Sequence, residues 1–422
     1  MPKIKKFLIV DDQDTNLLFF QVLLNELGYE SVFTASFGHD AMATAERFGA
    51  QFIISSWELS DMPGTALVQR LKGNRKFYNM PFLIYSKNIS ENEKALLKEI
   101  GKNEVLTMPF DREKAKSMIS AIIDKEAALS PDESKFRDME AAFATNEIEP
   151  ALKIVSDQLV NSSPISYKVN TLLGEIYLAM GAPKKAEEHL KKAKESPDCK
   201  GYIPFKRTLA KLYSATNRHS KAVKILKQLA DNSPLNIQTM LSLSSAYLMS
   251  GSDDEAKALV TEAEKVDPTS SDVVNEKIKI SISEGDIENT KALITQTENG
   301  DNLARDLNNM AIAMVAGGDF EKGITLYKQA ISLLSSKVKT YLLKFNLGMA
   351  YRKKGESENA FAEFCASYIS EPSYEKAYSA LAKVHKELKA SGKTPDSELI
   401  QKVKEARTTY KQSLESEAVK AS

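Results

Sequence analysis

The hydrophobic pattern divides the chain into two halves. Up to about residue 125, short and nearly continuous apolar runs alternate with amphipathic stretches. Such runs are typical of strands that are buried on both faces of a parallel sheet. Five of them are present, at residues 7–10, 31–34, 52–55, 82–85 and 105–107.

Helical patterns lie between these runs. Apolar residues recur at helical spacing in residues 17–27, 41–48, 65–71 and 91–100. Gly28 and Gly101 stand where two of these helices would end. The alternation predicts a doubly wound α/β domain of (βα)5 order over residues 1–127. In such folds, ligands gather where the carboxyl ends of the strands meet the loops.

From about residue 132 the pattern becomes helical throughout and repeats with a period of about 34 residues. Each clear copy has Leu followed by a small residue and then Tyr on a first helix, and Ala with a bulky apolar residue on a second. Pro follows. Clear copies begin at Leu173, Leu209, Leu243 and Leu347, and weaker ones lie near Met139, Ile278 and Met310. About seven units and a polar closing helix over residues 396–415 are expected within a superhelix of residues 132–422. Ser130-Pro131-Asp132 predicts a short break and a new N-cap between the halves.

Composition excludes several classes of protein. The 422 residues carry 57 basic and 57 acidic side chains, so a general binder of nucleic acid is not expected. Cys199 and Cys365 are too few for a disulfide framework, which fits a reducing cytosol. The apolar run near the start is too short for a signal peptide, and no run of about 18 apolar residues is present. We expect a cytoplasmic protein with no membrane insertion.

Candidate chemistry lies directly after the predicted strands. The first strand ends in Asp11-Asp12 and the third in Ser55-Ser56-Trp57, while Ser86 follows the fourth and Met108-Pro109 the fifth. This set resembles the receiver domain of two-component response regulators, and in particular the single-domain chemotaxis receiver. The resemblance covers residues 4 to about 125.

The resemblance implies a role for each position. In that family paired acids hold Mg²⁺, an Asp at the end of strand three accepts a phosphoryl group, a Ser or Thr after strand four hydrogen-bonds it, and a Lys before Pro-Phe pairs with it. Asp11, Asp12 and Ser86 match this pattern, whereas Ser56 stands at the acceptor position and Met108 at the lysine position. The resemblance also implies a cis peptide bond before Pro109.

The two departures predict a pocket without its usual chemistry. A serine hydroxyl with no general base is a poor phosphoryl acceptor and a poor metal ligand. Methionine brings no positive charge to an acyl phosphate and most readily packs as an adaptable hydrophobe. Val105 stands where many receivers carry an aromatic switch residue. We therefore expect no catalytic residue, no cofactor and at most weak, residual Mg²⁺ binding at Asp11 and Asp12.

Three alternatives stay open for these residues. Asp12, or Asp14 with Thr15, could cap the first helix instead of holding a metal. Ser56 could be the substrate of a serine kinase. Finally, Glu58 or Asp61, which lie beyond the end of the third strand, could accept the phosphoryl group.

The second half resembles an array of tetratricopeptide repeats. In that family the first helices line a concave groove that receives an extended peptide or a partner helix. Each residue that the resemblance places in the groove could also be part of a solvated helix face. The candidates are Lys168, Arg207, Lys211, Gln238, Arg305, Asn308, Phe345, Met349 and Arg352.

Together these features predict a non-catalytic bacterial signalling adaptor, in a two-component, chemotaxis or motility setting. Other proteins would bind the groove and the receiver face made by the fourth helix, fifth strand and fifth helix, which would also serve a homodimer. The alternative is a phospho-accepting regulator with a repeat-array output. Nucleic-acid binding is opposed by the neutral charge and by the absence of a helix-turn-helix pattern.

Overall fold

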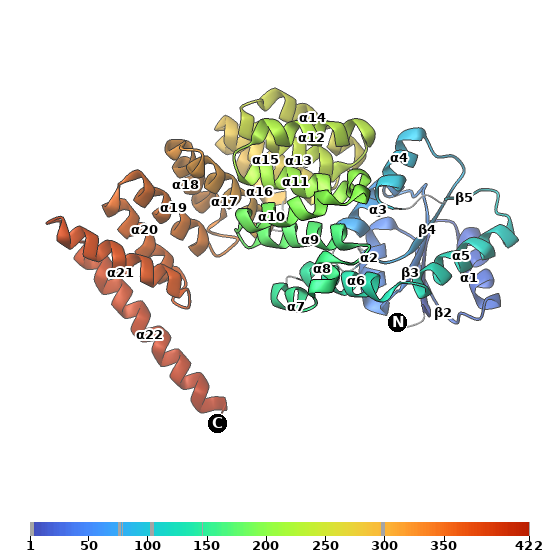
Figure 1. Ribbon diagram of the computed structural model, residues 1–422, viewed down its shortest axis with the longest axis horizontal. Coiled ribbons are helices and arrows are strands. Elements are labelled where there is room, and N and C mark those ends of the chain that lie inside the picture. Colours follow the sequence, from blue (N-terminus) through green and yellow to red (C-terminus); the bar gives the residue numbers. More distant parts are fainter. Residues whose placement is uncertain are drawn as a thin grey trace. The chain divides into compact units, whose positions relative to one another are not determined.

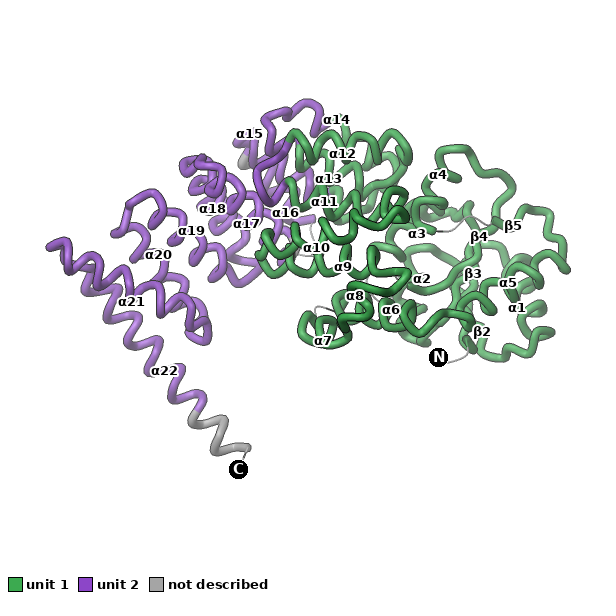
Figure 2. Tube along the Cα trace, viewed as in Figure 1, with its two compact units in different colours: residues 1–213, 220–246, 258–273 green, residues 214–219, 247–257, 274–422 purple. Residues whose placement is uncertain are grey.

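The computed structural model describes residues 4–74, 77, 79–101, 105–145, 147–296 and 300–421. A parallel sheet flanked by helices is followed by a long series of helices (Figure 1). The chain divides into two compact units (Figure 2). One holds residues 1–213, 220–246 and 258–273, and the other residues 214–219, 247–257 and 274–422. The predicted boundary near residues 127–132 lies inside the first unit and stays a prediction.

The sheet confirms the predicted strands. They pair in parallel in the order β2-β1-β3-β4-β5, which is the doubly wound arrangement. Each predicted run is a strand, lengthened by one residue at most. The strands are β1 (Lys6–Val10), β2 (Ser31–Ala35), β3 (Phe52–Ser56), β4 (Phe82–Ser86) and β5 (Val105–Thr107).

Alternating side chains of these strands build two cores. Phe7 and Ile9 of β1 belong to one cluster, which includes Phe20 and Ile119 from flanking helices. Leu8 and Val10 point to the opposite face and join a second cluster. Burial on both faces explains why the strands read as continuous apolar runs. The helices of this domain are α1 (Asp14–Glu26), α2 (Gly38–Phe48), α3 (Gly64–Gly73), α4 (Glu91–Glu99) and α5 (Arg112–Ala127).

The helix ends follow local sequence signals. Gly28 and Gly101 have φ of +84° and +77° directly after the C-caps of α1 and α4, where a side chain would be strained. The new N-cap expected at Ser130 is confirmed, because its side chain and that of Glu133 form a capping box.

From Pro131 onward the chain is helical. Its first part contains α6 (Pro131–Ala144), α7 (Ile148–Lys153), α8 (Asp157–Asn161), α9 (Ser166–Ala179), α10 (Pro183–Glu195), η1 (Pro197–Gly201), α11 (Ile203–Ala215), α12 (His219–Asn232), α13 (Ile237–Ser250) and α14 (Asp253–Val266). The remainder contains α15 (Ser271–Glu284), α16 (Ile287–Gln296), α17 (Gly300–Ala316), α18 (Phe320–Leu334), α19 (Tyr341–Lys354), α20 (Ser357–Ser370), α21 (Glu375–Ala390) and α22 (Ser397–Ala421). The predicted closing helix is α22. None of the helices in the described ranges is long and apolar enough to cross a membrane.

The repeated small residues allow close packing within helix pairs. In the pair α19 and α20, a Cβ atom built on Gly348 would lie 2.7 Å from a ring carbon of Phe364. In α9 and α10, a Cβ atom on Gly174 would lie 3.0 Å from the Leu190 side chain. A side chain at Gly348 would force Phe364 to move, and one at Gly174 would crowd Leu190, so both glycines favour close packing, which is the architectural role that the repeat pattern indicates.

Candidate functional site

The predicted pocket residues lie at the carboxyl end of the sheet. Ser56 and Ser86 are the last residues of β3 and β4, and Asp11 directly follows β1. Because β1, β3 and β4 are neighbouring parallel strands, these residues share one edge. All three residues are buried: Asp11 is 1% exposed, Ser56 5% and Ser86 2%. Their environment is therefore set by protein contacts.

Asp11 is tied into the protein by three donors. Its Oδ1 accepts a hydrogen bond from the Gln13 backbone N–H at 2.8 Å, and its Oδ2 accepts one from Asn16 Nδ2 at 2.8 Å. The Tyr85 hydroxyl also donates to Oδ2. Burial is the largest cause that raises the pKa of Tyr85, followed by the hydrogen bond to Asp11. Tyr85 therefore stays protonated and remains a donor.

The alternative that Asp12, or Asp14 with Thr15, caps the first helix is wrong. The N-cap of α1 is Gln13, which makes no side-chain capping hydrogen bond. Asp14 is already within the first turn of the helix. Asp12 is exposed, and its Oδ2 accepts a hydrogen bond from the Ser60 backbone N–H at 3.1 Å.

Glu58 connects the acceptor position to Ser86. The Ser56 hydroxyl donates to the Glu58 carbonyl oxygen at 3.0 Å. The Ser86 hydroxyl lies 2.5 Å from Glu58 Oε1 and 2.8 Å from the Asn88 carbonyl oxygen, so it donates to one or the other. The Lys87 backbone N–H also reaches Glu58 Oε1, at 3.3 Å. The Glu58 carboxylate therefore lies within hydrogen-bond distance of both the Ser86 hydroxyl and the Lys87 amide.

Asp61, the other alternative carboxylate, is engaged elsewhere. It accepts hydrogen bonds from the backbone N–H groups of Gly38 at 2.9 Å and His39 at 3.0 Å. Burial acts to raise the pKa of Asp61, but these hydrogen bonds and the His39 ring together hold it below its ordinary value.

Met108 packs as a hydrophobe. It is partly buried against the cluster that includes Phe20, Tyr85 and Leu106. The Met108–Pro109 peptide bond is cis, which confirms the expectation from the resemblance. Pro109 itself is exposed, and Val105 is partly buried in the opposite cluster.

Two features weaken the oxygen ligand set that the resemblance implies for Mg²⁺, and weak binding at Asp11 and Asp12 stays a prediction. Mg²⁺ needs several oxygen ligands at about 2.0–2.1 Å in octahedral geometry. Here both oxygens of Asp11 already accept hydrogen bonds, and Ser56 supplies a hydroxyl where the resemblance implies a carboxylate ligand. Within the described ranges, no group of three or more His, Cys, Asp or Glu side chains is placed to hold a metal ion.

Several groove candidates link the first helices of neighbouring repeats. Lys211 of α11 pairs with Glu175 of α9, and Gln238 of α13 donates to Asp272 of α15. Asn346 of α19 donates to the candidate Asn308 of α17. The guanidinium of candidate Arg352 pairs with Glu387 of α21. These residues therefore lie where first helices face one another, one repeat apart, and their role in binding a partner stays a prediction.

The remaining candidates have mixed environments. Phe345 stacks edge-on against Tyr374 and packs with Phe364, and Met349 is partly buried in the same cluster. Lys168 is partly exposed, with its ammonium 6.0 Å from the centre of the Tyr167 ring. Arg305 is exposed and makes interactions of its own.

Arg207, the ninth candidate, contacts the α/β domain. Within the first unit it pairs with Glu99 of α4, a side chain that is 3% exposed. Sequence patterns gave no sign of this pair, because α4 and α11 are separated by more than 100 residues.

A second group of contacts joins α3 to the repeats. Arg70 donates from Nε and a terminal nitrogen to the two carboxylate oxygens of Asp267, at 2.8 and 2.6 Å. The side-chain amide of Gln69 donates to the Leu235 carbonyl at 2.9 Å and accepts from the Ile237 backbone N–H at 2.7 Å. A bidentate pair and a two-sided amide contact fix a specific geometry. Within the first unit, α3 and α4 therefore contact the repeats through Gln69, Arg70 and Glu99, and we call these two helices the α3–α4 edge.

The comparisons agree with both halves of the chain. The family model for the response regulator receiver domain matches residues 7–120, and a tetratricopeptide repeat model matches residues 177–238. The probable chemotaxis protein CheY of Rhizobium etli is 30% identical over 120 residues, which are 28% of this chain and 91% of that protein.

Two further proteins show partial similarity. The alkaline phosphatase synthesis transcriptional regulatory protein PhoP of Bacillus subtilis is 28% identical over 36% of this chain, and the match spans only 61% of PhoP. A solved tetratricopeptide repeat protein from Parabacteroides merdae is 14% identical with a TM-score of 0.36, and the match covers 60% of this chain and 98% of that one.

Proposed function

Because the chain belongs to the response regulator receiver family through residues 7–120, we propose that it is a non-catalytic signalling adaptor whose receiver works without aspartyl phosphorylation. The receiver and the tetratricopeptide repeats make it a signalling protein with a protein-interaction array. In this proposal the receiver is a docking domain, and the array binds other proteins.

One observation carries the proposal. The acceptor position holds a serine hydroxyl that donates to the Glu58 carbonyl, and the Glu58 carboxylate lies 2.5 Å from the Ser86 hydroxyl. A phosphoryl group bound there would have to displace that carboxylate from Ser86 and the Lys87 amide. It would also meet the negative charges of Asp11, Asp12 and Glu58 without the ammonium that Met108 replaces. Both effects oppose phosphoryl transfer.

Docking within the first unit supports the second part of the proposal. Receiver residues Gln69, Arg70 and Glu99 contact the repeats through buried or partly buried polar groups. A receiver held in this way can position a partner on the array without a phosphate signal. The face made by α4, β5 and α5 is proposed as a partner or homodimer surface.

The proposed setting is bacterial two-component or chemotaxis-type signalling in the cytoplasm. The similar proteins are a chemotaxis protein and a transcriptional regulatory protein. A DNA-binding output is not proposed, because the chain has no net charge and repeats follow the receiver.

Intact-mass measurement after incubation with acetyl phosphate and Mg²⁺ tests the proposal. The full wild-type chain should gain no phosphoryl group. The matched variant Ser56→Asp/Met108→Lys/Glu58→Ala restores the acceptor and the cation and removes the competing carboxylate, so it should gain one. A phosphoryl gain by the wild type would contradict the proposal. Loss of that gain in Glu58→Gln would then identify Glu58 as the acceptor and favour the phospho-accepting alternative.

A further inference from the structure

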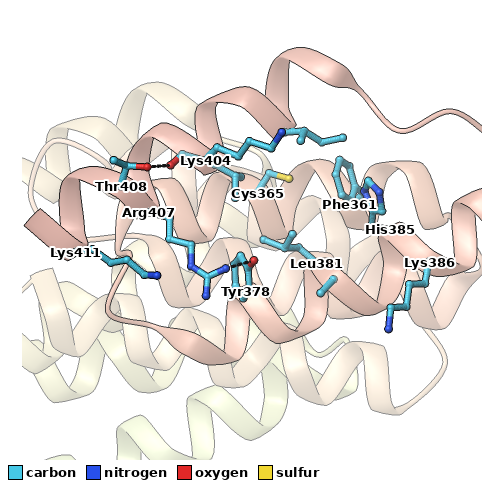
Figure 3. A pocket seen from close by; sticks show the side chains of 13 residues that line it. Phe361, Cys365, Tyr378, Leu381, His385, Lys386, Lys404, Arg407, Thr408 and Lys411 are labelled. Carbon is cyan, nitrogen blue, oxygen red and sulfur yellow. Dashed lines mark hydrogen bonds between the residues drawn. The ribbon is translucent and has the colours of Figure 1, made fainter.

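A cavity of about 550 Å³ lies in the second unit, among α20, α21 and α22 (Figure 3). We call it the α21–α22 pocket. Its volume is within the range of about 300–1,000 Å³ that is typical of ligand sites. Apolar side chains from all three helices line it, namely Phe361, Cys365, Leu381, Ala382, Ile400 and Val403.

Apart from His385, the charged side chains that line this pocket are all positive. These are Lys386 of α21 and Lys404, Arg407 and Lys411 of α22, and no Asp or Glu is among the lining residues. The whole chain has 57 acidic and 57 basic residues, so this one-sided lining is a local feature. It creates a positive potential over an apolar floor.

These cations differ from their neighbours in lacking acidic partners. Close by in the chain, Lys393 pairs with Glu358 and Lys402 pairs with Glu398, at 2.9 and 2.6 Å. Within the described ranges, none of the four lining cations forms an ion pair. Arg407 instead donates to the Tyr378 hydroxyl and lies 4.0 Å from the centre of that ring. Its guanidinium has five N–H donors, so it keeps donors for another acceptor.

Three of the four cations lie along one face of α22, and the fourth, Lys386, lies on α21. Ile400, Val403, Lys404, Arg407 and Lys411 are spaced as one stripe along α22. Tyr378, Leu381 and His385 form a similar stripe along α21. Figure 3 shows Arg407 and Lys411 beside Tyr378 at one end, and His385 with Lys386 at the other. The positive charge is therefore spread over about two helical turns, or roughly 11 Å.

We propose that the α21–α22 pocket binds an acidic amphipathic helix of a partner protein. Apolar side chains one turn apart on that helix would enter the floor, and carboxylates along its edges would meet Lys386, Lys404, Arg407 and Lys411. A helix lying in an apolar groove is a common mode of recognition, and here charge complementarity selects an acidic one. None of the nine groove candidates lines this pocket, so it is a second binding site, separate from the groove in the proposed function.

Fluorescence anisotropy with the full chain tests this site. The probe is a fluorescein-labelled 14-residue peptide with leucine at helical spacing and glutamate and alanine elsewhere, in about 50 mM salt to limit screening. The wild type should bind it saturably. Lys404→Glu/Arg407→Glu should weaken binding at least tenfold. The matched control, Lys402→Glu/Lys393→Glu, makes the same change of charge on residues that do not line the pocket and should change binding less than about twofold.

A second variant keeps the test valid if the first misfolds. Lys386→Glu/Lys411→Glu leaves the contact between Arg407 and Tyr378 intact and should also weaken binding at least tenfold. A peptide with lysine in place of glutamate should not bind. The proposal is overturned if the acidic peptide shows no saturation up to about 1 mM. Equal weakening by the pocket and control variants would also overturn it, because it would mean attraction to net charge alone.

Discussion

The strand-end pocket of the receiver and the α21–α22 pocket differ in whether their polar side chains have partners within the chain. In the first, Asp11, Ser56 and Ser86 are buried and each finds hydrogen-bond partners within the chain. In the second, four cations line an apolar cavity and form no ion pair within the described residues. Polar groups that are satisfied from within stabilise a shape, whereas unpaired charges are available to a partner.

A match to a family pattern therefore does not by itself show that a side chain can bind a ligand. Three of the receiver landmarks, Asp11, Asp12 and Ser86, match their family, yet Asp11 accepts a hydrogen bond from Tyr85 and Ser86 lies within hydrogen-bond distance of Glu58. The α21–α22 pocket matches no motif, yet its four cations form no ion pair within the described residues and can meet the carboxylates of a partner.

Replacing Asp11→Ala should cause the largest loss of stability. The change leaves the buried Tyr85 hydroxyl and the Asn16 amide without their acceptor. Each unsatisfied group costs about 1–3 kcal/mol, so the free energy of unfolding should fall by about 3–4 kcal/mol in urea titration. Tyr85→Phe removes one of the donors and should cost about 1–2 kcal/mol. A loss below about 1 kcal/mol for Asp11→Ala would mean that Asp11 is not a structural residue.

Replacing Arg70→Ala should loosen the docked α3–α4 edge. It leaves the Asp267 carboxylate, which is 3% exposed, without its bidentate partner. Losing one partner of a buried pair costs about 3–5 kcal/mol, and because Arg70 is 25% exposed we expect about 2 kcal/mol. Hydrogen exchange should become faster in α3 and in residues 267–273. The exposed Arg47, which lies over the Phe48 ring, provides the control Arg47→Ala. Unchanged exchange in Arg70→Ala would show that the pair does not hold the edge.

Glu140 of α6 should make stability depend on pH. Burial is the largest cause that raises its pKa from 4.5 to about 7, against the Asn79 hydrogen bond and the charges of Arg137, Lys168 and Lys72. The folded state therefore holds this proton more tightly than the unfolded state, and stability falls as pH rises from 4.5 to about 7.

Glu140→Gln should remove that fall. The variant should be more stable than the wild type by about 1–2 kcal/mol at pH 8, and nearly equal to it near pH 4.5. Thermal unfolding across this range measures the effect. Parallel curves for the two proteins would contradict the shifted pKa.

Replacing Lys404→Gln and Lys411→Gln together should have the smallest effect on stability. Both side chains are exposed and neither forms an ion pair in the described part of the chain, so the free energy of unfolding should change by less than about 0.5 kcal/mol. Urea titration checks this value. A loss above about 1 kcal/mol would mean that these cations are satisfied from within, and the contrast between the two pockets would disappear.

Much of the fold could be predicted from sequence because it follows periodic burial. The strands and the glycine stops at Gly28 and Gly101 are local patterns, and each was predicted to within a residue. The glycines of the repeats indicate where neighbouring helices pack closely, as at Gly348, where the Phe364 ring occupies the space of a side chain. Such signals are properties of the backbone and its immediate neighbours.

The contacts of the candidate sites could not be predicted in the same way. Glu58 follows the end of β3, where no period fixes the direction of a side chain, and only the folded loop brings its carboxylate to Ser86. The pair of Arg70 with Asp267 joins residues 197 positions apart. The cations of α22 are recognisable as a stripe only once the facing helices are known. The alternative of an acidic N-cap for α1 fails, because the helix begins after Gln13 and the Asp12 carboxylate accepts a hydrogen bond from the Ser60 backbone N–H.

The links between neighbouring first helices have a consequence for how the array can change in length. Lys211 with Glu175 and Arg352 with Glu387 each join residues about one repeat apart and reach no further. A duplication or deletion of one whole repeat would interrupt only the links of this kind at its borders and would leave the other links between first helices with their own partners. The array can therefore gain or lose whole modules, whereas an insertion of a few residues within a helix would shift the residues of that helix away from their partners one repeat away.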